Sequence, residues 1–291
     1  MRWSVLASST RCWLPEVRAA LLQLTAGDDP EANLPVTLSM IAEAAQGGAE
    51  FVATPEVTNI VSLSKARQDA VLHTEDTDPT LAALRTAARE HRIWLPVGSL
   101  ALRGPDRFAN RSFMITPDGQ IAARYDKIHM FDVSIDADEK YRESARYAPG
   151  TQATLVDTPL GAVGMMICYD MRFPALSSAL TRAGARVLLY PSAFSPVTGA
   201  AHWESLLRAR AIENGAWVIA AAQTGTHVAA EGPARKTHGH SLVIDPWGTV
   251  MLDAGTDAGV YRFDLDPSAV DDARARIPAL ANARAFEGPN V

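Results

Sequence analysis

Short apolar runs alternate with amphipathic stretches from Val17 onward, and glycine, proline and aspartate stand at most of the junctions. The first cycle shows the pattern. Residues 17–24 form an apolar run that predicts a strand, and Asp29-Pro30-Glu31 supplies the cap, proline and acid typical of a helix start. Apolar side chains then recur at helical spacing, at Leu34, Leu38, Ile41 and Ala45. Pro35 would strain the interior of this helix, so a later start at Asn33 is the alternative.

The same alternation continues to the end of the chain. Further strands are predicted at residues 51–54, 93–102, 108–116, 120–125, 153–156, 162–167, 186–190, 217–222, 241–244 and 260–265. Further helices are predicted after Asp78-Pro79, at residues 174–183 and around residues 203–212, with a polar loop over 132–146. No linker divides the series, so it predicts one α/β domain over residues 17–286, with strands and helices alternating around layered sheets.

The two ends of the chain differ from this pattern. Residues 1–16 contain an apolar run that is interrupted by Ser4, Ser8, Ser9 and Thr10, which makes it too weak for a secretory signal. We therefore expect residues 1–16 to be an extension outside the fold and residues 287–291 to be a C-terminal tail.

Composition narrows the class of protein. Hydrophobic residues make up 47% of the 291, which is ample for a large core, and the formal charge of −6 leaves no basic footprint for nucleic acid. No apolar run approaches the roughly 20 residues that cross a bilayer. The two cysteines, Cys12 and Cys168, lack the paired spacing of a disulfide framework or a zinc site, so we expect a cytoplasmic protein. His238 and His240 lack a third ligand at suitable spacing, so no metal site is predicted.

Cys168 is a candidate nucleophile because of where it stands. It follows the apolar run 163–167, which fits a strand buried on both faces, and Tyr169 and Asp170 come directly after it. Ligands commonly meet the chain just beyond such strand ends. Taken alone, however, a cysteine after an apolar strand is more often a small core residue than a nucleophile.

Three charged residues stand at comparable places. Glu56 follows the strand 51–54, Lys127 follows the strand 120–125, and Glu143 precedes Pro149-Gly150. Each has a plain alternative: Glu56 as a helix cap, Lys127 as a solvated side chain, and Glu143 as one more surface acid. Together with Cys168 they supply the base, the cation and the nucleophile needed to attack an amide carbon.

The segments around these residues resemble the nitrilase superfamily of carbon–nitrogen hydrolases. TPEVTN holds Glu56, RYDKIHMFD holds Lys127 and GMMICYDMRFP holds Cys168, and they look like the three signatures of that superfamily. The segments YPSAFSPVTGAAHWESLLRARAIENGAWVIAAAQTGTH and GHSLVIDPWGTV resemble its Nit branch, close to the deaminated glutathione amidases. The resemblance covers about residues 17–286, in order.

The resemblance implies a four-layer αββα sandwich that pairs into an αββα-αββα homodimer or a higher even oligomer, without metal or organic cofactor. It implies that Cys168 is the nucleophile, Glu56 the general base, Lys127 the stabiliser of the tetrahedral intermediate and Glu143 the residue that orients the site. The chemistry agrees, because a partly buried thiolate beside two carboxylates is disfavoured and proton transfer to Glu56 must accompany attack. The Tyr169 backbone N–H would join Lys127 in holding the oxyanion.

The substrate is expected to be a small amide that carries a carboxylate. Arg172, four residues after Cys168, suits a fork-like contact with a substrate carboxylate, and a structural salt bridge to Asp170 is the alternative. The resemblance implies that Phe194 and Thr198 line the acyl pocket. It suggests an amide whose acyl part carries an α-keto or other carboxylate, such as deaminated glutathione.

Two positions depart from the pattern of the Nit branch, which commonly has a proline where Ala200 stands and an aromatic residue where His238 stands. Both lie outside the catalytic set, so they bear on specificity. The alternatives within enzymes are ω-amidase or N-carbamoyl amidase activity on the same residues, ahead of nitrile hydrolysis. From other classes, a silent scaffold is disfavoured by the intact set of four residues, and a thiol redox sensor by the poor placement of Cys12 as a resolving cysteine.

Overall fold

The fold is built on two layers of strands, one formed by a six-stranded sheet and the other by two three-stranded sheets that lie edge to edge. The computed structural model describes residues 16–135, 140–230 and 232–288. Residues 1–15 of the expected extension, with Cys12, and residues 289–291 of the expected tail therefore lie outside the described residues. Among the described residues, no helix is both long and apolar enough to cross a membrane.

The first layer, called the first sheet below, consists of the three-stranded sheets β16-β1-β2 and β3-β4-β5. Its strands are β16 (Gly259–Leu265), β1 (Val17–Gln23), β2 (Phe51–Ala53), β3 (Leu95–Arg103), β4 (Phe108–Ile115) and β5 (Ile121–Asp126). Backbone hydrogen bonds from Val52 to Trp94 and from Thr54 to Pro96 join β2 to β3 in the middle of this layer. Successive side chains of a strand point to opposite faces of the sheet. Ala19 and Leu21 of β1 therefore belong to one hydrophobic cluster, and Ala20 and Leu22 belong to another.

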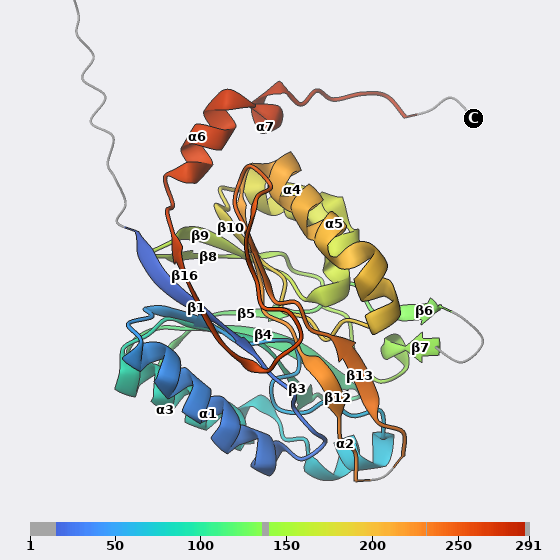
Figure 1. Cartoon of the computed structure of the whole chain (residues 1–291). Coiled ribbons are helices and arrows are strands. Elements are labelled where there is room, and N and C mark those ends of the chain that lie inside the picture. The colour runs from blue at the N-terminus through green and yellow to red at the C-terminus, as the bar shows by residue number, and fades with distance from the viewer. Residues whose placement is uncertain (1–15, 136–139, 231, 289–291) are drawn as a thin grey trace, which may run out of the picture.

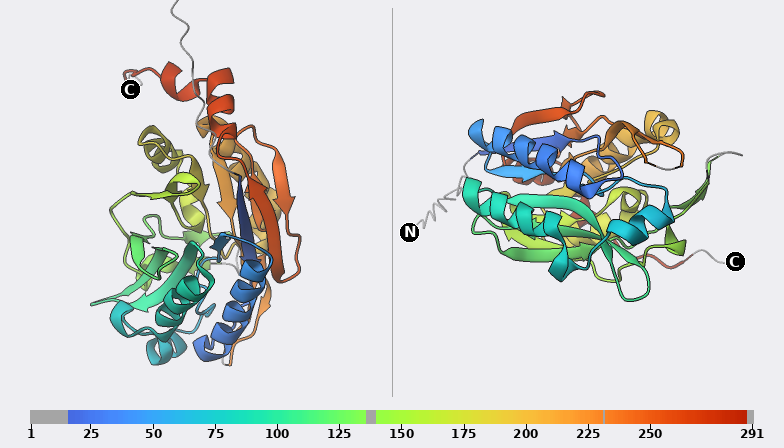
Figure 2. Two further views of the ribbon diagram at one scale, coloured as in Figure 1. Left: turned by 90° about the vertical axis from the view of Figure 1, so that its left-hand side faces the viewer. Right: turned by 90° about the horizontal axis from the view of Figure 1, so that it is seen from below.

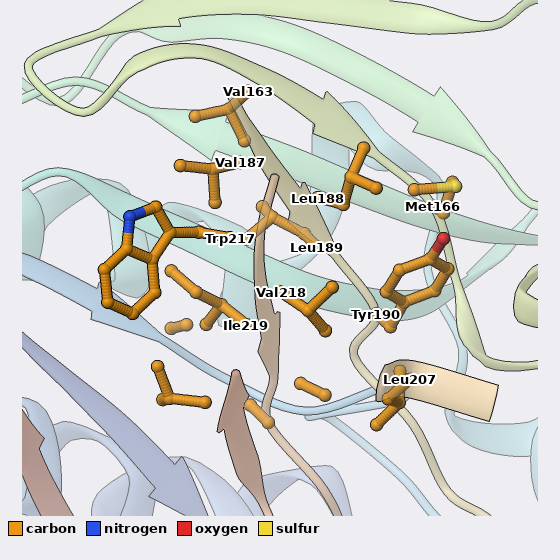
Figure 3. Packing of buried hydrophobic residues seen from close by; sticks show 14 of the residues in the cluster. Val163, Met166, Val187, Leu188, Leu189, Tyr190, Leu207, Trp217, Val218 and Ile219 are labelled. Atoms are coloured by element: carbon orange, nitrogen blue, oxygen red, sulfur yellow. The ribbon is translucent and has the colours of Figure 1, made fainter. Parts of the chain in front are cut away.

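The second sheet has the order β15-β14-β11-β10-β9-β8. Its strands are β15 (Val250–Asp253), β14 (Leu242–Ile244), β11 (Trp217–Ala220), β10 (Val187–Leu189), β9 (Gly161–Met165) and β8 (Thr154–Thr158). The central strands β9, β10 and β11 are parallel. Figure 3 shows Leu188 and Leu189 of β10 beside Val218 and Ile219 of β11 in one apolar cluster. These strands are covered on both faces, which explains their unbroken apolar runs.

Helices cover the outer face of each sheet. The first sheet is covered by α1 (Pro30–Gln46) and α3 (Pro79–His91), and the second by α4 (Pro174–Arg182) and α5 (Pro196–Asn214) (Figure 1). The inner faces pack against each other, so the layers run α, β, β, α as the sequence predicts. Helices α6 (Ala269–Arg276) and α7 (Ala279–Asn282) lie at one end of the molecule (Figure 2).

Shorter elements fill the loops between the layers. They are the helix α2 (Lys65–Val71), the 3-10 helices η1 (Glu75–Thr77), η2 (Glu143–Ala145) and η3 (Cys168–Arg172), and the strand pairs β6 (Asp132–Ser134) with β7 (Lys140–Arg142) and β12 (Thr224–His227) with β13 (Arg235–His238). The polar loop expected over residues 132–146 is therefore wrong in part, because β6 and β7 pair within it. Each of these strands has three residues, of which only the middle one is partly buried, so their sequences contain too few apolar residues to indicate a strand.

Pro35 does not delay the first helix. The helix begins at Pro30 and includes Pro35, with the Asp29 side chain accepting a hydrogen bond from the Glu31 backbone N–H at 3.1 Å. Pro35 lies beyond the first turn, because the Asn33 backbone N–H already donates to the Asp29 carbonyl at 3.1 Å, so the helix continues without the hydrogen bond that a backbone N–H at position 35 would make. Asn33, the alternative start, instead binds the loop before the helix through its side chain and Gly27.

Candidate active site

Glu56 is held at the end of β2 by an irregularity in the neighbouring strand β3. The register of β3 against β4 shifts between Val97 and Leu100, and there the Ser99 hydroxyl accepts a hydrogen bond from the Val57 backbone N–H at 2.8 Å. Val57 has φ +48°, a left-handed conformation that is unfavourable for a β-branched residue. Gly98 completes the contact, because a Cβ on it would meet the Thr54 carbonyl oxygen at 2.1 Å. The turn therefore directs the Glu56 side chain inward, where the residue is 4% exposed.

Lys127 joins the two glutamates. It directly follows β5, and its ammonium donates to Glu56 Oε1 at 2.9 Å and to both Glu143 oxygens at 3.1 and 2.9 Å. Asn110 on β4 donates from Nδ2 to Glu56 Oε1 at 2.9 Å and to Glu143 Oε1 at 3.2 Å. The Phe131 backbone N–H donates to Glu143 Oε2 at 2.7 Å. One cation, the Asn110 amide and backbone N–H groups thus hold both carboxylates in a largely buried site.

Cys168 begins the 3-10 helix η3, three residues beyond β9. Its φ is +48°, and its backbone N–H donates to the Pro191 carbonyl at 2.9 Å. Backbone strain of this kind persists only where the surroundings fix it, and it is common at functional sites. Asp170 supplies part of that fixation, because it accepts from the Tyr125 hydroxyl at 2.7 Å and from the Ile167 backbone N–H at 2.9 Å.

The charges of the site act on one another. Burial raises the pKa of the Cys168 thiol, and the nearby Glu56 carboxylate raises it further, against the opposing effect of Lys127. Burial also raises the pKa of Glu56, but Lys127, Arg235 and Asn110 together outweigh it and leave that pKa below its ordinary value. For Lys127, burial lowers the pKa, and Glu143 and Glu56 raise it well above the usual value. The resting site therefore holds a neutral thiol, an ionised Glu56 and an ammonium.

A cavity of about 500 Å³ opens onto these groups. It brings together seven of the eight residues that the sequence singles out, namely Glu56, Lys127, Glu143, Cys168, Tyr169, Phe194 and Thr198. Thr198 Oγ1 is buried and has no hydrogen-bond partner among the described residues, so it can accept or donate to a ligand. The described lining residues carry two carboxylates, Glu56 and Glu143, against the cationic side chains of Lys127, Lys140, Arg142, Arg146 and Arg235. This balance favours an anionic ligand.

Arg172 lies beside the cavity but is not among the residues that line it. Its guanidinium carbon is 5.9 Å from the Tyr169 ring centre and 5.6 Å from that of Phe194, and its Nη2 is 3.2 Å from His202 Nδ1. The alternative salt bridge to Asp170 does not form, because Asp170 is fully buried and its oxygens receive Tyr125, Ile167 and His129 instead. Arg172 is thus next to the cavity with one face against two of its lining rings.

Three neighbours of the site were missed by sequence reasoning. Asn110 bonds both glutamates, Ala193 donates its backbone N–H to Glu56 Oε2 at 2.8 Å, and Arg235 lines the cavity. A signal was present only for Asn110, because asparagine is unfavourable inside a strand such as β4. Among the described residues, no group of three or more histidine, cysteine, aspartate or glutamate side chains is placed to hold a metal ion.

Comparison with known proteins identifies relatives over most of the chain. The carbon-nitrogen hydrolase family matches residues 18–275. Deaminated glutathione amidase of Yersinia enterocolitica is 38% identical over 276 residues, which cover 93% of this chain and 94% of that protein. The mouse protein of the same name is 39% identical over 285 residues, covering 96% and 86%.

Solved structures give the same result. The nitrilase and Fhit fusion protein NitFhit of Caenorhabditis elegans superposes with a TM-score of 0.84 at 38% identity, covering 92% of this chain and 65% of that one. Nit3 of Saccharomyces cerevisiae, described as a member of branch 10 of the nitrilase superfamily, superposes with a TM-score of 0.79 at 30% identity, covering 90% and 94%.

Proposed function

Since the chain belongs to the carbon–nitrogen hydrolase family of the nitrilase superfamily, and is thus a hydrolase of carbon–nitrogen bonds other than peptide bonds, we propose that it is a cysteine-dependent amidase. The proposed reaction cleaves a carboxylate-bearing linear amide, with deaminated glutathione as the preferred substrate, through a thioester between the acyl group and Cys168. The observation that carries this proposal is the convergence of Glu56, Lys127, Glu143 and Cys168 on one cavity.

Glu56 acts first, as a general base. Because the pKa of the Cys168 thiol is raised by burial and by the carboxylate beside it, little thiolate exists at rest. Glu56 is ionised, so it takes the thiol proton as the sulfur attacks the amide carbon. The new C–S bond forms while the electron pair of the C=O bond moves onto oxygen.

Lys127 and the Tyr169 backbone N–H stabilise that oxygen. Lys127 is held by two carboxylates, and Tyr169 is in the first turn of η3, where backbone N–H groups have no partner within the helix. Removing one such donor typically lowers the rate of related enzymes about a hundredfold or more.

Collapse of the intermediate returns the proton from Glu56 to the departing amine and breaks the C–N bond. Glu56, ionised again, then takes a proton from the water that attacks the thioester, which releases the acid and restores the thiol. Glu143 keeps Lys127 in place during these steps, because the Lys127 ammonium donates to both of its carboxylate oxygens.

The acyl half of the substrate is placed by Phe194, Thr198 and Arg172 in this proposal. Thr198 Oγ1 has an unused hydrogen-bonding capacity at the cavity, and Arg172 lies against the rings of Phe194 and Tyr169. A guanidinium binds a carboxylate through two parallel hydrogen bonds. Support for an α-keto acyl group comes from the relatives named deaminated glutathione amidase.

Mass spectrometry of the acylated protein tests the mechanism. With deaminated glutathione, we expect release of 2-oxoglutarate and cysteinylglycine, and a quenched reaction should contain protein whose mass is increased by the acyl group on Cys168. Cys168→Ala should abolish both, and Glu56→Gln should lower the turnover rate by about 10²- to 10⁴-fold. Ammonia release from 2-oxoglutaramate or from an N-carbamoyl amide at a higher kcat/KM would favour the ω-amidase or carbamoyl amidase alternative, and no turnover of any amide would favour a silent scaffold.

The protein is also proposed to be a cytoplasmic homodimer, paired through α5. Ile212 on α5 is 53% exposed, and Trp247 in the turn between β14 and β15 is 45% exposed. The β14–β15 turn lies against α5, because a Cβ on Gly248 would meet the Ile212 side chain at 2.5 Å. Light scattering after size-exclusion chromatography should give a dimer for the native chain and a monomer for Ile212→Glu.

A further inference from the structure

Three aromatic rings that line the cavity form a row of contacts, and a guanidinium lies against each of the two outer rings. Phe131 is the middle ring, with the Tyr169 centroid 5.1 Å away and the Tyr141 centroid 5.0 Å away. The guanidinium carbon of Arg172 is 5.9 Å from the Tyr169 ring, and that of Arg235 is 6.0 Å from the Tyr141 ring. A ligand lying along the row would therefore have a cation near each of its ends.

Arg235 has hydrogen-bonding capacity left for such a ligand. Its Nη2 donates to the Ala193 carbonyl at 2.7 Å, while its Nε is buried without a hydrogen-bond partner among the described residues. No carboxylate in the described part of the chain forms an ion pair with Arg235, although it lies close enough to Glu56 to lower the pKa of that group. A buried donor without an acceptor is costly, so an acceptor supplied by a ligand would be favourable.

The position of Arg235 relative to Glu56 indicates which half of the substrate it meets. Ala193 connects the two: its N–H donates to Glu56 Oε2, and its carbonyl accepts from Arg235. In the proposed mechanism, Glu56 passes a proton to the departing amine, so the amine must lie against Glu56. The part of the substrate beyond that nitrogen can then reach the Arg235 guanidinium, because only Ala193 stands between Glu56 and Arg235.

We propose that Arg235 binds a carboxylate on the amine half of the substrate, so that the site prefers amides with an anionic group at both ends. The inference rests on the proposed amidase function. In deaminated glutathione the second anion is the glycine carboxylate of the departing cysteinylglycine. A molecule of tripeptide length spans roughly 10 Å when extended, so its two ends can meet different groups of a cavity of about 500 Å³.

A purely structural role for Arg235 makes a different prediction. If Arg235 only braced the Ala193 carbonyl, its removal would disturb Glu56 and slow all substrates alike. If it binds a carboxylate, its removal must also change the preference between two substrates that differ only in that carboxylate. The informative quantity is therefore a ratio of kcat/KM values, because a common loss through Ala193 and Glu56 cancels from it.

The test compares deaminated glutathione with its C-terminal glycinamide, whose amine half is neutral. Both release 2-oxoglutarate, so one coupled assay serves both. For the native protein, we expect kcat/KM to be about 10- to 100-fold higher for the carboxylate form, the range of a hydrogen bond to a charged group. In Arg235→Met the ratio should fall close to one, mainly through KM, and Arg235→Lys should keep an intermediate ratio.

Lys236→Met is the matched control, because Lys236 is the neighbouring cation on β13, is exposed, and is not among the residues that line the cavity. It should keep the native ratio. A native ratio near one, or an Arg235→Met protein that loses activity equally on both substrates, would overturn the assignment while leaving the amidase function intact. Hydrolysis of neither substrate by the native protein would reject the proposed function, and this inference with it.

Discussion

Lys127 Nζ lies 2.9 Å from Glu56 Oε1, and both side chains are almost completely buried. Taking either charge out of water alone would cost several kcal/mol. The pair is stable because Glu143 and Asn110 complete its hydrogen bonds, so that each charged atom has partners. The same contacts that stabilise the resting site keep a base and a cation at the place where the reaction needs them.

Removal of Lys127 should therefore damage stability as well as turnover. In Lys127→Met, two carboxylates face each other without the cation, which typically costs about 3–5 kcal/mol of unfolding free energy. Burial then raises the folded-state pKa of Glu56 above its unfolded value, so the loss grows as pH rises. Urea denaturation at pH 5 and pH 7.5 should show a larger deficit at the higher pH. A Lys127→Met protein with near-native turnover would contradict the role given to this residue.

Asn110 should act on the pH profile through Glu56. Its amide is one of the groups that keep the Glu56 pKa below the ordinary value, behind the larger effect of Lys127. Glu56 must be ionised to accept the thiol proton, so kcat/KM falls on the acid side as Glu56 becomes protonated. In Asn110→Leu the fall in kcat/KM on the acid side should begin at higher pH. At the pH optimum, kcat/KM should be about tenfold lower than for the native protein.

The neighbouring strand residue Ser112 provides the control for this shift. Ser112 is also buried on β4, and its hydroxyl donates to the Val97 carbonyl at 2.9 Å without contacting either glutamate. Ser112→Ala should keep the acid side of the native profile. If the acid side of the kcat/KM profile of Asn110→Leu were the same as that of the native protein, the Asn110 amide would have no effect on the pKa of Glu56.

The three principal residues of the site could be located from sequence because each follows a strand. Glu56 and Cys168 come shortly after apolar runs, Lys127 directly follows the half-exposed strand β5, and the residues after β2, β5 and β9 meet at the cavity. Strand ends are visible in hydrophobic periodicity, and their sequence signatures are specific. Unbroken apolar strands need cover on both faces, so the pattern predicted layered sheets, while the four-layer order came from the resemblance to the nitrilase superfamily.

The contacts that complete the site were not visible in the same pattern. Arg235 lies on β13, a polar two-stranded element whose placement depends on its packing against the Ala193 segment. Ala193 acts through its backbone, which every residue type possesses. The sequence pattern also could not show whether Arg172 pairs with Asp170. Tyr125 and His129, which are distant in sequence, bind that carboxylate in place of Arg172.

Arg172 should affect substrate affinity more than chemistry. It lies outside hydrogen-bond reach of the four central residues and against the rings of Tyr169 and Phe194. Arg172→Met keeps the apolar stem and removes the fork that would hold the acyl carboxylate, so KM should rise about 10- to 100-fold with a smaller change in kcat. Steady-state kinetics with deaminated glutathione measures this directly. An unchanged KM would remove Arg172 from the acyl site.

His227 should make the protein less stable in mild acid. Its ring is buried between the Ala26 carbonyl and the Thr237 hydroxyl, both 2.7 Å away, and burial lowers its pKa from 6.5 to about 4. Because the folded-state pKa is below the unfolded one, the unfolded chain binds more protons between these values. The contribution of the neutral ring is therefore complete above pH 6.5 and is lost progressively as pH falls toward 4, by about 3 kcal/mol in all.

His227→Gln isolates this term, since an amide fits a similar volume and does not titrate. Its unfolding free energy should start about 1 kcal/mol lower at pH 7.5, for the imperfect hydrogen bonds, and should then depend less steeply on pH than that of the native protein. Urea denaturation at several values between pH 7.5 and 4.5 gives both slopes. If the unfolding free energies of the two proteins changed with pH at the same rate, His227 would not govern acid stability. Protonation would then not weaken the hydrogen bond between His227 and Thr237 that joins β12 to β13, the strand on which Arg235 lies.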